Sequence, residues 1–439
     1  MIKQKLDLFK EKFNSFPPLD SFWDFSFAFP EVNKKYQISL GEGLTATKKS
    51  IRIGPNLGLN DLFFKDETHN PTNSFKDRAA ALLISDARSK GFHKVVCASN
   101  GNQGASISAY TSLEGMKCVN IIPEEIDIGK KAQMMVYNSK IIVKGDIIDD
   151  AIGYALKEKY KKDYYQCTPE YNPLTIEGQK TIAFEIYLDV GIPDWIIVPM
   201  GNGGCLVSLW KGFTELKNTG LIKRYPKLVG VQTKSCSPIV NAYLNRNDTK
   251  IHKKKEFKSK ASSVLVKKPF YQSLCLKAIK ETKGTALAIP ENLMISAISE
   301  LARYEGIFAE PASALTISAL NLLIQEHGMK KGDLTICVIT GSGLKAPYVL
   351  EAISSRAKTA GMGGILSTKL KILSQISISR EKGIHGTRLK EIIGSISLPA
   401  IYQHLKELEA KNLIRRKKKG KKVIYFITEE GTKVLEAME

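Results

Sequence analysis

Lys76 has the setting in this sequence that best suits chemistry. It lies in the stretch KDETHNPTNSFKDRAA (65–80), after a run of residues at 70–74 that favour turns and helix caps. Residues 79–87 continue as good helix formers, so we expect Lys76 in the first turn of a helix. Backbone N–H groups there disfavour a charged ammonium, which would lower the lysine pKa and suit Schiff-base chemistry. The alternative for this stretch alone is a surface lysine on a loop.

A second polar stretch, ASNGNQG (98–104), follows an expected strand and opens an expected helix. Loops at the carboxyl ends of parallel strands bind ligands in open α/β folds, through backbone N–H groups and side-chain amides. Ser99, Asn100 and Gln103 could therefore hold a carboxylate, and Asn102 a phenolic oxygen. A purely structural strand–helix turn is the alternative.

Two further turns also follow expected strands. In PMGNGGC (199–205), three glycines let the backbone approach an anion, and the helix that follows supplies a positive field. No Lys-Ser/Thr pair follows, so the turn suits a single phosphate rather than a nucleoside triphosphate. A plain tight turn is the alternative. In TGSGLK (340–345), Thr340 can hydrogen-bond a pyridine nitrogen without fully protonating it.

Short apolar strands alternate with amphipathic helices between these motifs. We expect strands at 62–64, 95–97, 119–122, 141–143, 195–198, 228–231 and 334–339. We expect helices at 103–113, 128–137, 149–160, 176–188, 206–216, 296–304 and 312–325. This alternation predicts an α/β protein with a mainly parallel sheet, and the length suggests two such units.

The composition favours a soluble globular protein of the cytoplasm. Among 439 residues, 43% are hydrophobic and 25% charged, and no apolar run reaches the roughly 18 residues of a membrane span. The first residues, MIKQKLDLFKEKF, lack a secretory signal pattern. The seven cysteines are scattered with no CxxC pair, which fits a reduced compartment and predicts no metal site.

The net charge of +21 is unevenly distributed. The tail, 365–439, has 16 Lys and Arg against 8 Asp and Glu, after a change of composition near 360–364 that we take as a domain boundary. The lysine-dense stretch 249–268 is expected to be a solvated loop, with contact to an anionic partner as the alternative. An aromatic-rich extension, 1–36, is expected to pack on the main body.

Residues 37–360 resemble the threonine synthase branch of the fold-type II (tryptophan synthase β-like) pyridoxal-phosphate enzymes. The resemblance rests on GEGLT (41–45), KDETHNPTNSFKDRA (65–79), ASNGNQGAS (98–106), IEGQKTIAFEI (176–186), GNGGC (201–205), EGIFAEPASA (305–314) and TGSGLK (340–345). It implies a two-lobed parallel-sheet fold, pyridoxal phosphate as cofactor and Lys76 as the Schiff-base lysine.

The same resemblance implies roles for the other motif residues. Cofactor contacts are implied for Phe75, Lys76, Asn102, Gly201, Asn202, Gly203, Gly204, Cys205 and Thr340. Contacts with the substrate carboxylate are implied for Ser99, Asn100 and Gln103.

One stretch departs from the family pattern. Members that act on O-phosphohomoserine typically carry NSxNPYRxEGQKT, whose Asn, Ser and Arg grip the substrate phosphate. The corresponding residues here are Pro169, Glu170 and Thr175. A carboxylate at that place would repel a phosphate. Either other cations, such as Lys180 or Arg78, bind the phosphate, or the leaving group is not phosphate.

The tail resembles the winged helix-turn-helix domains of archaeal and bacterial regulators. Helices are expected at 366–379, 387–393 and 398–411, followed by a β-hairpin with Gly420 at its tip and a last helix. The resemblance implies 398–411 as the recognition helix and 415–422 as the wing, whose cations would meet DNA phosphates. The basic residues concerned are Arg415, Arg416, Lys417, Lys418 and Lys419. A basic oligomerisation or stability module is the alternative.

Three functional hypotheses follow. The first is a threonine synthase-like lyase that takes a small amino-acid substrate. The second keeps pyridoxal phosphate but performs β-elimination or β-replacement on a serine-type substrate, as dehydratases and cysteine or cysteate synthases do. The third is a transcription regulator whose body senses an amino acid through pyridoxal phosphate. A homodimer without a membrane anchor is the default expectation for all three.

Overall fold

The chain, described here by a computed structural model, forms two compact units, Met1–Val349 and Leu350–Glu439. The structure describes residues 7, 10–12, 14, 19–30, 32–124, 126–157, 160, 162–245, 261–346, 362–379, 383–394, 396–419 and 422–436. Most of the lysine-dense stretch 249–268, the start of the expected boundary at 360–364 and the hairpin tip Gly420 lie outside these residues.

The larger sheet of the first unit has six strands in the order β1-β2-β10-β7-β8-β9. They are β1 (Thr47–Lys49), β2 (Leu62–Asp66), β7 (Trp195–Pro199), β8 (Lys227–Thr233), β9 (Thr285–Ile289) and β10 (Thr335–Ile339). The edge strand β1 runs antiparallel to β2, and every other pairing is parallel. The central strands β7 and β10 are buried throughout, as expected for parallel strands covered on both faces.

A smaller, fully parallel sheet forms the second lobe of this unit, in the order β5-β4-β3-β6. Its strands are β3 (Lys94–Ala98), β4 (Lys117–Ile122), β5 (Lys140–Val143) and β6 (Tyr165–Gln166). The two sheets confirm the predicted two-lobed, mainly parallel α/β architecture.

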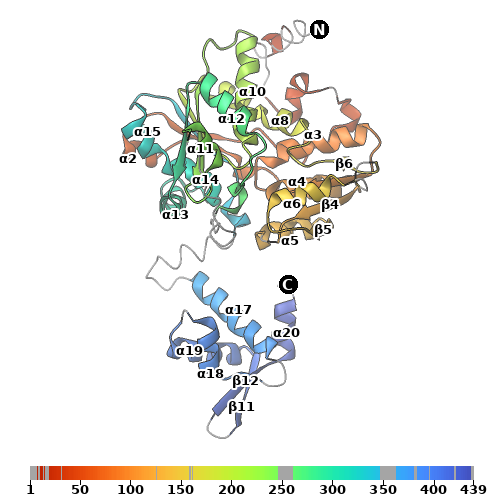
Figure 1. Cartoon of the computed structure of the whole chain (residues 1–439), viewed down its shortest axis with the longest axis vertical. Helices are drawn as coiled ribbons and strands as arrows, with labels where there is room; N and C mark the ends of the chain where they lie inside the picture. Colours follow the sequence, from red (N-terminus) through yellow and green to blue (C-terminus); the bar gives the residue numbers. More distant parts are fainter. Residues whose placement is uncertain are drawn as a thin grey trace. The chain divides into compact units, whose positions relative to one another are not determined.

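Helices pack around the two sheets (Figure 1). The α-helices of this unit are α2 (Ile53–Leu57), α3 (Lys76–Ser89), α4 (Asn102–Leu113), α5 (Ile128–Val136), α6 (Ile148–Ala155), α8 (Leu174–Gln179), α9 (Thr181–Val190), α10 (Gly204–Asn218), α11 (Pro238–Tyr243), α12 (Gln272–Glu281), α13 (Glu291–Glu300), α14 (Pro311–Ser318) and α15 (Leu320–Glu326). Shorter turns of helix are η1 (Phe22–Ala28), η2 (Lys34–Tyr36), η3 (Glu67–His69), η5 (Ser262–Val264), η6 (Leu301–Glu305) and η7 (Gly343–Lys345).

Some elements differ from the sequence prediction. The helix expected at 176–188 is divided into α8 and α9 at Lys180, which keeps helical dihedrals (φ −62°, ψ −20°). The helix expected at 312–325 is divided in the same way at Ala319. Apolar periodicity continues across such breaks and does not reveal them. The strands β1 and β6 are too short to give an alternating pattern.

The aromatic residues of the N-terminal extension join the core of the first unit. Phe22 and Phe25 are fully buried, and the rings of Phe25 and Phe184 lie 5.6 Å apart. The indole nitrogen of Trp23 donates a hydrogen bond to the Ile38 carbonyl at 2.8 Å. The described part of the extension therefore packs on the main body, as its aromatic content suggested.

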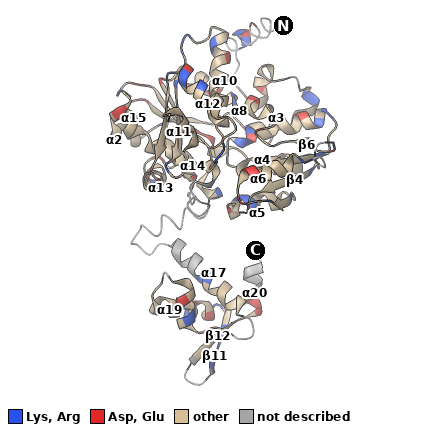
Figure 2. Ribbon diagram, viewed as in Figure 1, with Lys and Arg blue, Asp and Glu red and all other residues tan. Residues whose placement is uncertain are grey.

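The second unit contains α17 (Met362–Ile378), α18 (Gly386–Ile393), α19 (Leu398–Ala410), β11 (Ile414–Lys419), β12 (Lys422–Ile427) and α20 (Glu429–Glu436). Every expected element is present, and the strands form an antiparallel hairpin with basic residues on β11 (Figure 2). Ile372, Ile401, Leu405 and Tyr425 belong to its own apolar core. Within the described parts of both units, every helix is too short or too polar to span a membrane.

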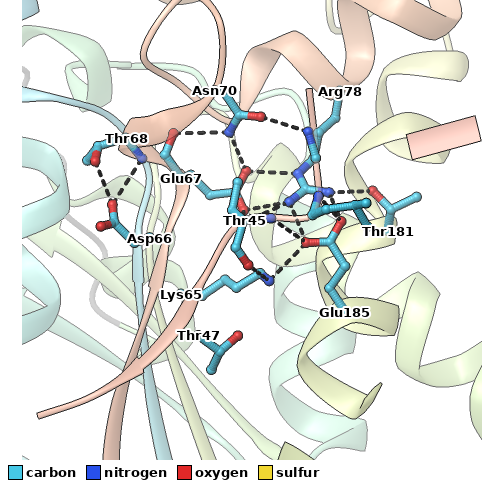
Figure 3. A network of polar contacts seen from close by, with 12 residues as sticks. Thr45, Thr47, Lys65, Asp66, Glu67, Thr68, Asn70, Arg78, Thr181 and Glu185 are labelled. Carbon is cyan, nitrogen blue, oxygen red and sulfur yellow. Dashed lines mark hydrogen bonds and ion pairs between the residues drawn. The ribbon is translucent and has the colours of Figure 1, made fainter. Parts of the chain in front are cut away.

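A buried ionic network surrounds Arg78, two residues after Lys76 (Figure 3). Its guanidinium donates two hydrogen bonds to Glu67, at 2.8 and 2.7 Å, and also binds Glu185 through both terminal nitrogens. Lys65 makes an ion pair with Glu185 at 2.9 Å and donates to the Thr45 carbonyl at 2.6 Å. Burial alone would raise the pKa of Glu185, but the charges of Arg78 and Lys65 lower it to about 2.

Replacing Arg78 with Met should lower the free energy of unfolding by about 3–5 kcal/mol, because two buried carboxylates lose their main cation. Urea denaturation at neutral pH measures this loss. The Glu185 contribution is complete above its ordinary pKa of 4.5 and is lost as the pH falls toward 2, so the two proteins should converge on acidification. Lys49→Met, which breaks the exposed Lys49–Asp61 pair, is the control and should cost less than about 1 kcal/mol. Equal losses in the two variants would contradict the assigned role of Arg78.

Candidate active site

One cavity lies where strands of both sheets end. All twelve residues that the sequence analysis assigned to cofactor or substrate line it, namely Phe75, Lys76, Ser99, Asn100, Asn102, Gln103, Gly201, Asn202, Gly203, Gly204, Cys205 and Thr340. The other lining residues are Ala98, Ile148, Pro169, Glu170, Thr175, Pro199, Ser263, Val264, Val266, Tyr271, Glu310 and Ala312. The carboxyl ends of β3, β6, β7 and β10 supply most of these loops, so the parallel topology itself gathers the site.

Lys76 is the first residue of α3 and faces this cavity. The preceding residue, Phe75, fixes the helix start because its backbone N–H donates to the Thr340 carbonyl at 3.1 Å. Burial lowers the pKa of Lys76, and the Glu170 carboxylate partly opposes this effect. The ammonium therefore loses its proton more readily than an exposed lysine, which favours a nucleophilic amine.

The loop before α4 is shaped by Ser99 and Gly101. The Ser99 hydroxyl oxygen accepts hydrogen bonds from the N–H groups of Gly101 and Gly104, both at 3.0 Å. Gly101 has φ 139°, and a Cβ atom there would lie 2.3 Å from Cδ of Lys130. Neither end of the buried Gln103 amide has a hydrogen-bond partner among the described residues. An unpaired amide lining a cavity is the feature expected of a ligand contact.

Glu310 is a charged lining residue that the sequence analysis did not single out, although it lies in the family-like stretch 305–314. Its carboxylate accepts from the Asn102 amide at 3.0 and 3.2 Å and lies 3.5 Å from the ammonium of Lys130. Burial alone would lower the pKa of Lys130, but Glu310 and Asp127 raise it. Glu310 is thus neutralised by a buried cation, while Oδ1 of Asn102 has no partner among the described residues.

The glycine turn before α10 has the geometry of an anion cradle. Gly203 has φ 90°, and a Cβ atom there would lie 2.2 Å from Sγ of Cys275. No described side chain caps α10, so the N–H groups of its first turn stay open to a ligand. Asn202 fixes the turn: its amide donates to Glu170 at 2.6 Å, and its side-chain and backbone oxygens accept from Phe270 and Tyr271.

Thr340 follows β10 and has a partner that was not predicted. Its hydroxyl lies 2.9 Å from the hydroxyl of Ser313, which also accepts from the N–H of Gly341 at 3.1 Å. Ser313 thereby orients the Thr340 side chain toward the cavity that it lines. As with Glu310, the signal for Ser313 lay in the family-like stretch 305–314.

The proposal that Lys180 or Arg78 binds a substrate phosphate is wrong. Lys180 lies outside the cavity and pairs with Glu177 and Glu215, at 2.6 and 2.8 Å. Arg78 is fully buried in the network described above. The phosphate-gripping positions of the family are occupied by Glu170 and by Thr175, whose buried hydroxyl has no partner among the described residues.

The arrangement fits the pyridoxal phosphate that the sequence predicted. The uncapped start of α10 can take the phosphate, and Lys76 can reach a carbonyl carbon in the same cavity. The open oxygen of Asn102 and the neutral hydroxyl of Thr340 suit the hydroxyl group and nitrogen of the cofactor ring.

Comparison with known proteins shows which families and which proteins this chain resembles. Residues 38–341 match the family described as pyridoxal-phosphate dependent enzyme, and residues 366–439 match the HxlR-like helix-turn-helix. A threonine synthase of Methanocaldococcus jannaschii is 38% identical over 330 residues, covering 74% of this chain and 80% of the relative. Threonine synthases of Methanosarcina acetivorans and Mycobacterium tuberculosis are 32% and 34% identical, covering 75% and 71% of this chain and 81% and 84% of their own lengths.

Solved structures agree on the fold of the first unit. Maize serine racemase superposes with a TM-score of 0.60 at 18% identity, covering 71% of this chain and 92% of the racemase. Threonine deaminase isoform 2 of Solanum lycopersicum gives 0.58 at 18% identity, covering 72% and 88%. The chain therefore belongs to the pyridoxal-phosphate dependent enzymes of fold type II, and it carries a C-terminal HxlR-like helix-turn-helix domain.

Proposed function

We propose that the first unit is a threonine synthase-like lyase that converts O-phospho-L-homoserine and water into L-threonine and phosphate. The observation that carries this proposal is the cavity lined by all twelve residues assigned to cofactor or substrate, in a chain 38% identical to a threonine synthase over most of that relative's length. The racemase and deaminase structures support the fold and leave the reaction open.

When bound, pyridoxal phosphate would supply an electron sink for a carbanion at the substrate α carbon. Lys76 would hold the cofactor and then, through Nζ, take one proton from the α carbon and one from the β carbon and return them to the α and γ carbons. Its lowered pKa suits this role as a base. Gln103 would bind the substrate carboxylate through its unpaired amide, together with Asn100 and the loop held by Ser99.

A second candidate is β-elimination or β-replacement on a serine-type substrate with the same cofactor. Glu170 favours it, because this carboxyl group lines the cavity where the family pattern would place the grip on a phosphate. Lys76 is the one cation among the described lining residues. Release of phosphate together with threonine from O-phospho-L-homoserine separates the first candidate from the second.

Lys76→Ala should lower phosphate release at least about 100-fold, since it removes the group assigned to proton transfer. It should also change the visible absorbance of the bound cofactor. Lys345→Ala would be a poor control, because it removes a buried contact with Thr72. The exposed Lys117→Ala, outside the cavity, is the better comparison. Retained turnover in Lys76→Ala would contradict the assigned role.

We further propose that the second unit binds DNA. The match to an HxlR-like helix-turn-helix supports this, as does the form of the hairpin. Arg415, Arg416, Lys417 and Lys418 are exposed on β11; Arg416 pairs with Glu409 at 3.0 Å, whereas the two lysines have no ion-pair partner among the described residues. Unpaired cations on one exposed strand suit contact with phosphates.

The helix α19 would supply the sequence-reading contacts. Ser397 caps its start, and Ile401, Leu405 and Leu408 anchor one face in the core of the unit. Tyr402, Gln403 and Lys406 are exposed on the opposite side. These side chains can reach base edges when such a helix enters the major groove.

Replacing Lys417 and Lys418 with Ala should weaken binding of the full chain to duplex DNA and reduce the salt dependence. Each lost phosphate contact should lower the slope of log affinity against log salt by about 0.9. Fluorescence anisotropy over a salt series measures both effects. Lys34→Ala with Lys35→Ala removes the same charge from the exposed surface of the first unit and should leave the slope unchanged. No DNA binding at low salt would exclude the proposal, whereas DNA binding without amino-acid turnover would favour a regulator.

A further inference from the structure

Glu170 is the carboxyl group in the active-site cavity that forms no ion pair within 4 Å among the described residues. It follows β6, lines the cavity and accepts a hydrogen bond from the uncharged amide of Asn202 at 2.6 Å. The other lining carboxylate, Glu310, is paired with Lys130. Lys76 is the cation whose charge acts on Glu170, and its amine is assigned to the reaction.

Burial favours the neutral form of Glu170, although hydrogen bonds from its own backbone N–H and from the Asn202 amide favour the carboxylate. Burial raises its pKa, the Asp149 carboxylate raises it further, and Lys76 opposes the rise. Tyr271 and Cys97 also face this group and are uncharged at neutral pH, since burial raises both of their pKa values. The adjoining outer cavity, which shares Glu170, contains Lys211 with Glu177 and Glu215; these three charges pair with one another and with Lys180.

A phosphate group entering this cavity would strengthen the preference of Glu170 for its neutral form. A carboxylate beside a dianion is strongly disfavoured, so a proton on the carboxyl group resolves the conflict. The neutral acid can keep accepting from Asn202 through one oxygen while its other oxygen carries an O–H donor. The residue that excludes phosphate as a carboxylate would then bind it as an acid.

We propose that Glu170, as a neutral carboxylic acid, binds the substrate phosphate and protonates it as it leaves. This inference rests on the proposed threonine-forming reaction. The bond between Cγ and the ester oxygen breaks, its electron pair stays on that oxygen, and the oxygen takes the Glu170 proton, so the group departs as hydrogen phosphate. The γ carbon, which has lost the ester oxygen, takes the proton that Lys76 removed from Cβ and becomes the methyl group. The water that later adds at Cβ gives its hydroxyl to the product and its proton to the Glu170 carboxylate, which completes the balance.

Ligand binding tests, without turnover, whether Glu170 binds the substrate phosphate as a neutral acid. The probe is the phosphonate analogue of O-phospho-L-homoserine in which a methylene replaces the bridging oxygen, so that it cannot leave. Calorimetric titration of the holoenzyme over a pH series, in buffers of different ionisation enthalpy, measures the protons taken up, including at a pH where Glu170 is ionised before the analogue binds. Wild type and Glu170→Asp should take up more protons than Glu170→Gln, by up to one per site. Glu170→Gln can still accept from Asn202 but cannot titrate.

Kinetic measurements test whether Glu170 protonates the leaving phosphate. Glu170→Gln should lower kcat for phosphate release about 100-fold. It should also abolish the fall in rate that we expect for the wild type as the pH rises through the Glu170 pKa. Glu215→Gln, a change of the same kind in the outer cavity, should match the wild type in proton uptake and pH profile. Thermal melting and cofactor absorbance check that each variant is folded and loaded.

The outcomes separate this inference from the proposed function. Threonine formation by the wild type, with equal proton uptake in wild type and Glu170→Gln at every pH of the series, would overturn the role of Glu170 and leave the lyase intact. Failure of the wild type both to bind the analogue and to form threonine would overturn both proposals. Faster turnover of the phosphate ester by Glu170→Gln would show that the carboxyl group only repels phosphate, which would also overturn the inference.

Discussion

The bidentate binding of Arg78 to two buried carboxylates is the constraint on which the active site depends. Arg78 lies on α3, so its bonds to Glu67 and Glu185 fix the helix whose first residue is Lys76. Glu185 lies on α9 and also accepts from the backbone of Thr45, so the early glycine turn is tied to the same point. A planar guanidinium can make these contacts together because its donors are arranged as a rigid fork.

Parallel topology accounts for the convergence of residues far apart in sequence. The loops that hold Ser99, Glu170, Asn202 and Thr340 all follow the carboxyl ends of strands, although they come from two different sheets. The positive first turns of α3, α4 and α10 begin beside the same cavity. An anionic cofactor and an amino-acid carboxylate therefore find fixed dipoles there, and the site needs few charged side chains.

The sequence predicted the fold class and the main motif residues because these depend on local patterns and recognisable turns. It could not predict Ser313 as the partner of Thr340, or Lys130 as the partner of Glu310, since such pairs depend on packing between distant elements. The same limitation explains the error over Lys180, because its side chain is directed into a buried ion cluster with Glu177 and Glu215. The sequence did not predict the helix breaks at Lys180 and Ala319, because the backbone there stays helical and the apolar periodicity continues across them.

Asn202 connects Glu170 with the glycine turn that precedes α10. One side chain donates to Glu170 and accepts from the backbone of Phe270, while its own backbone belongs to the glycine turn that precedes α10. A shift of the turn on binding an anion would therefore move the hydrogen bond to Glu170 as well. Since that bond favours the carboxylate, its weakening would favour the neutral acid. Occupation of the cradle and the proton on Glu170 would thus be coupled through a single amide.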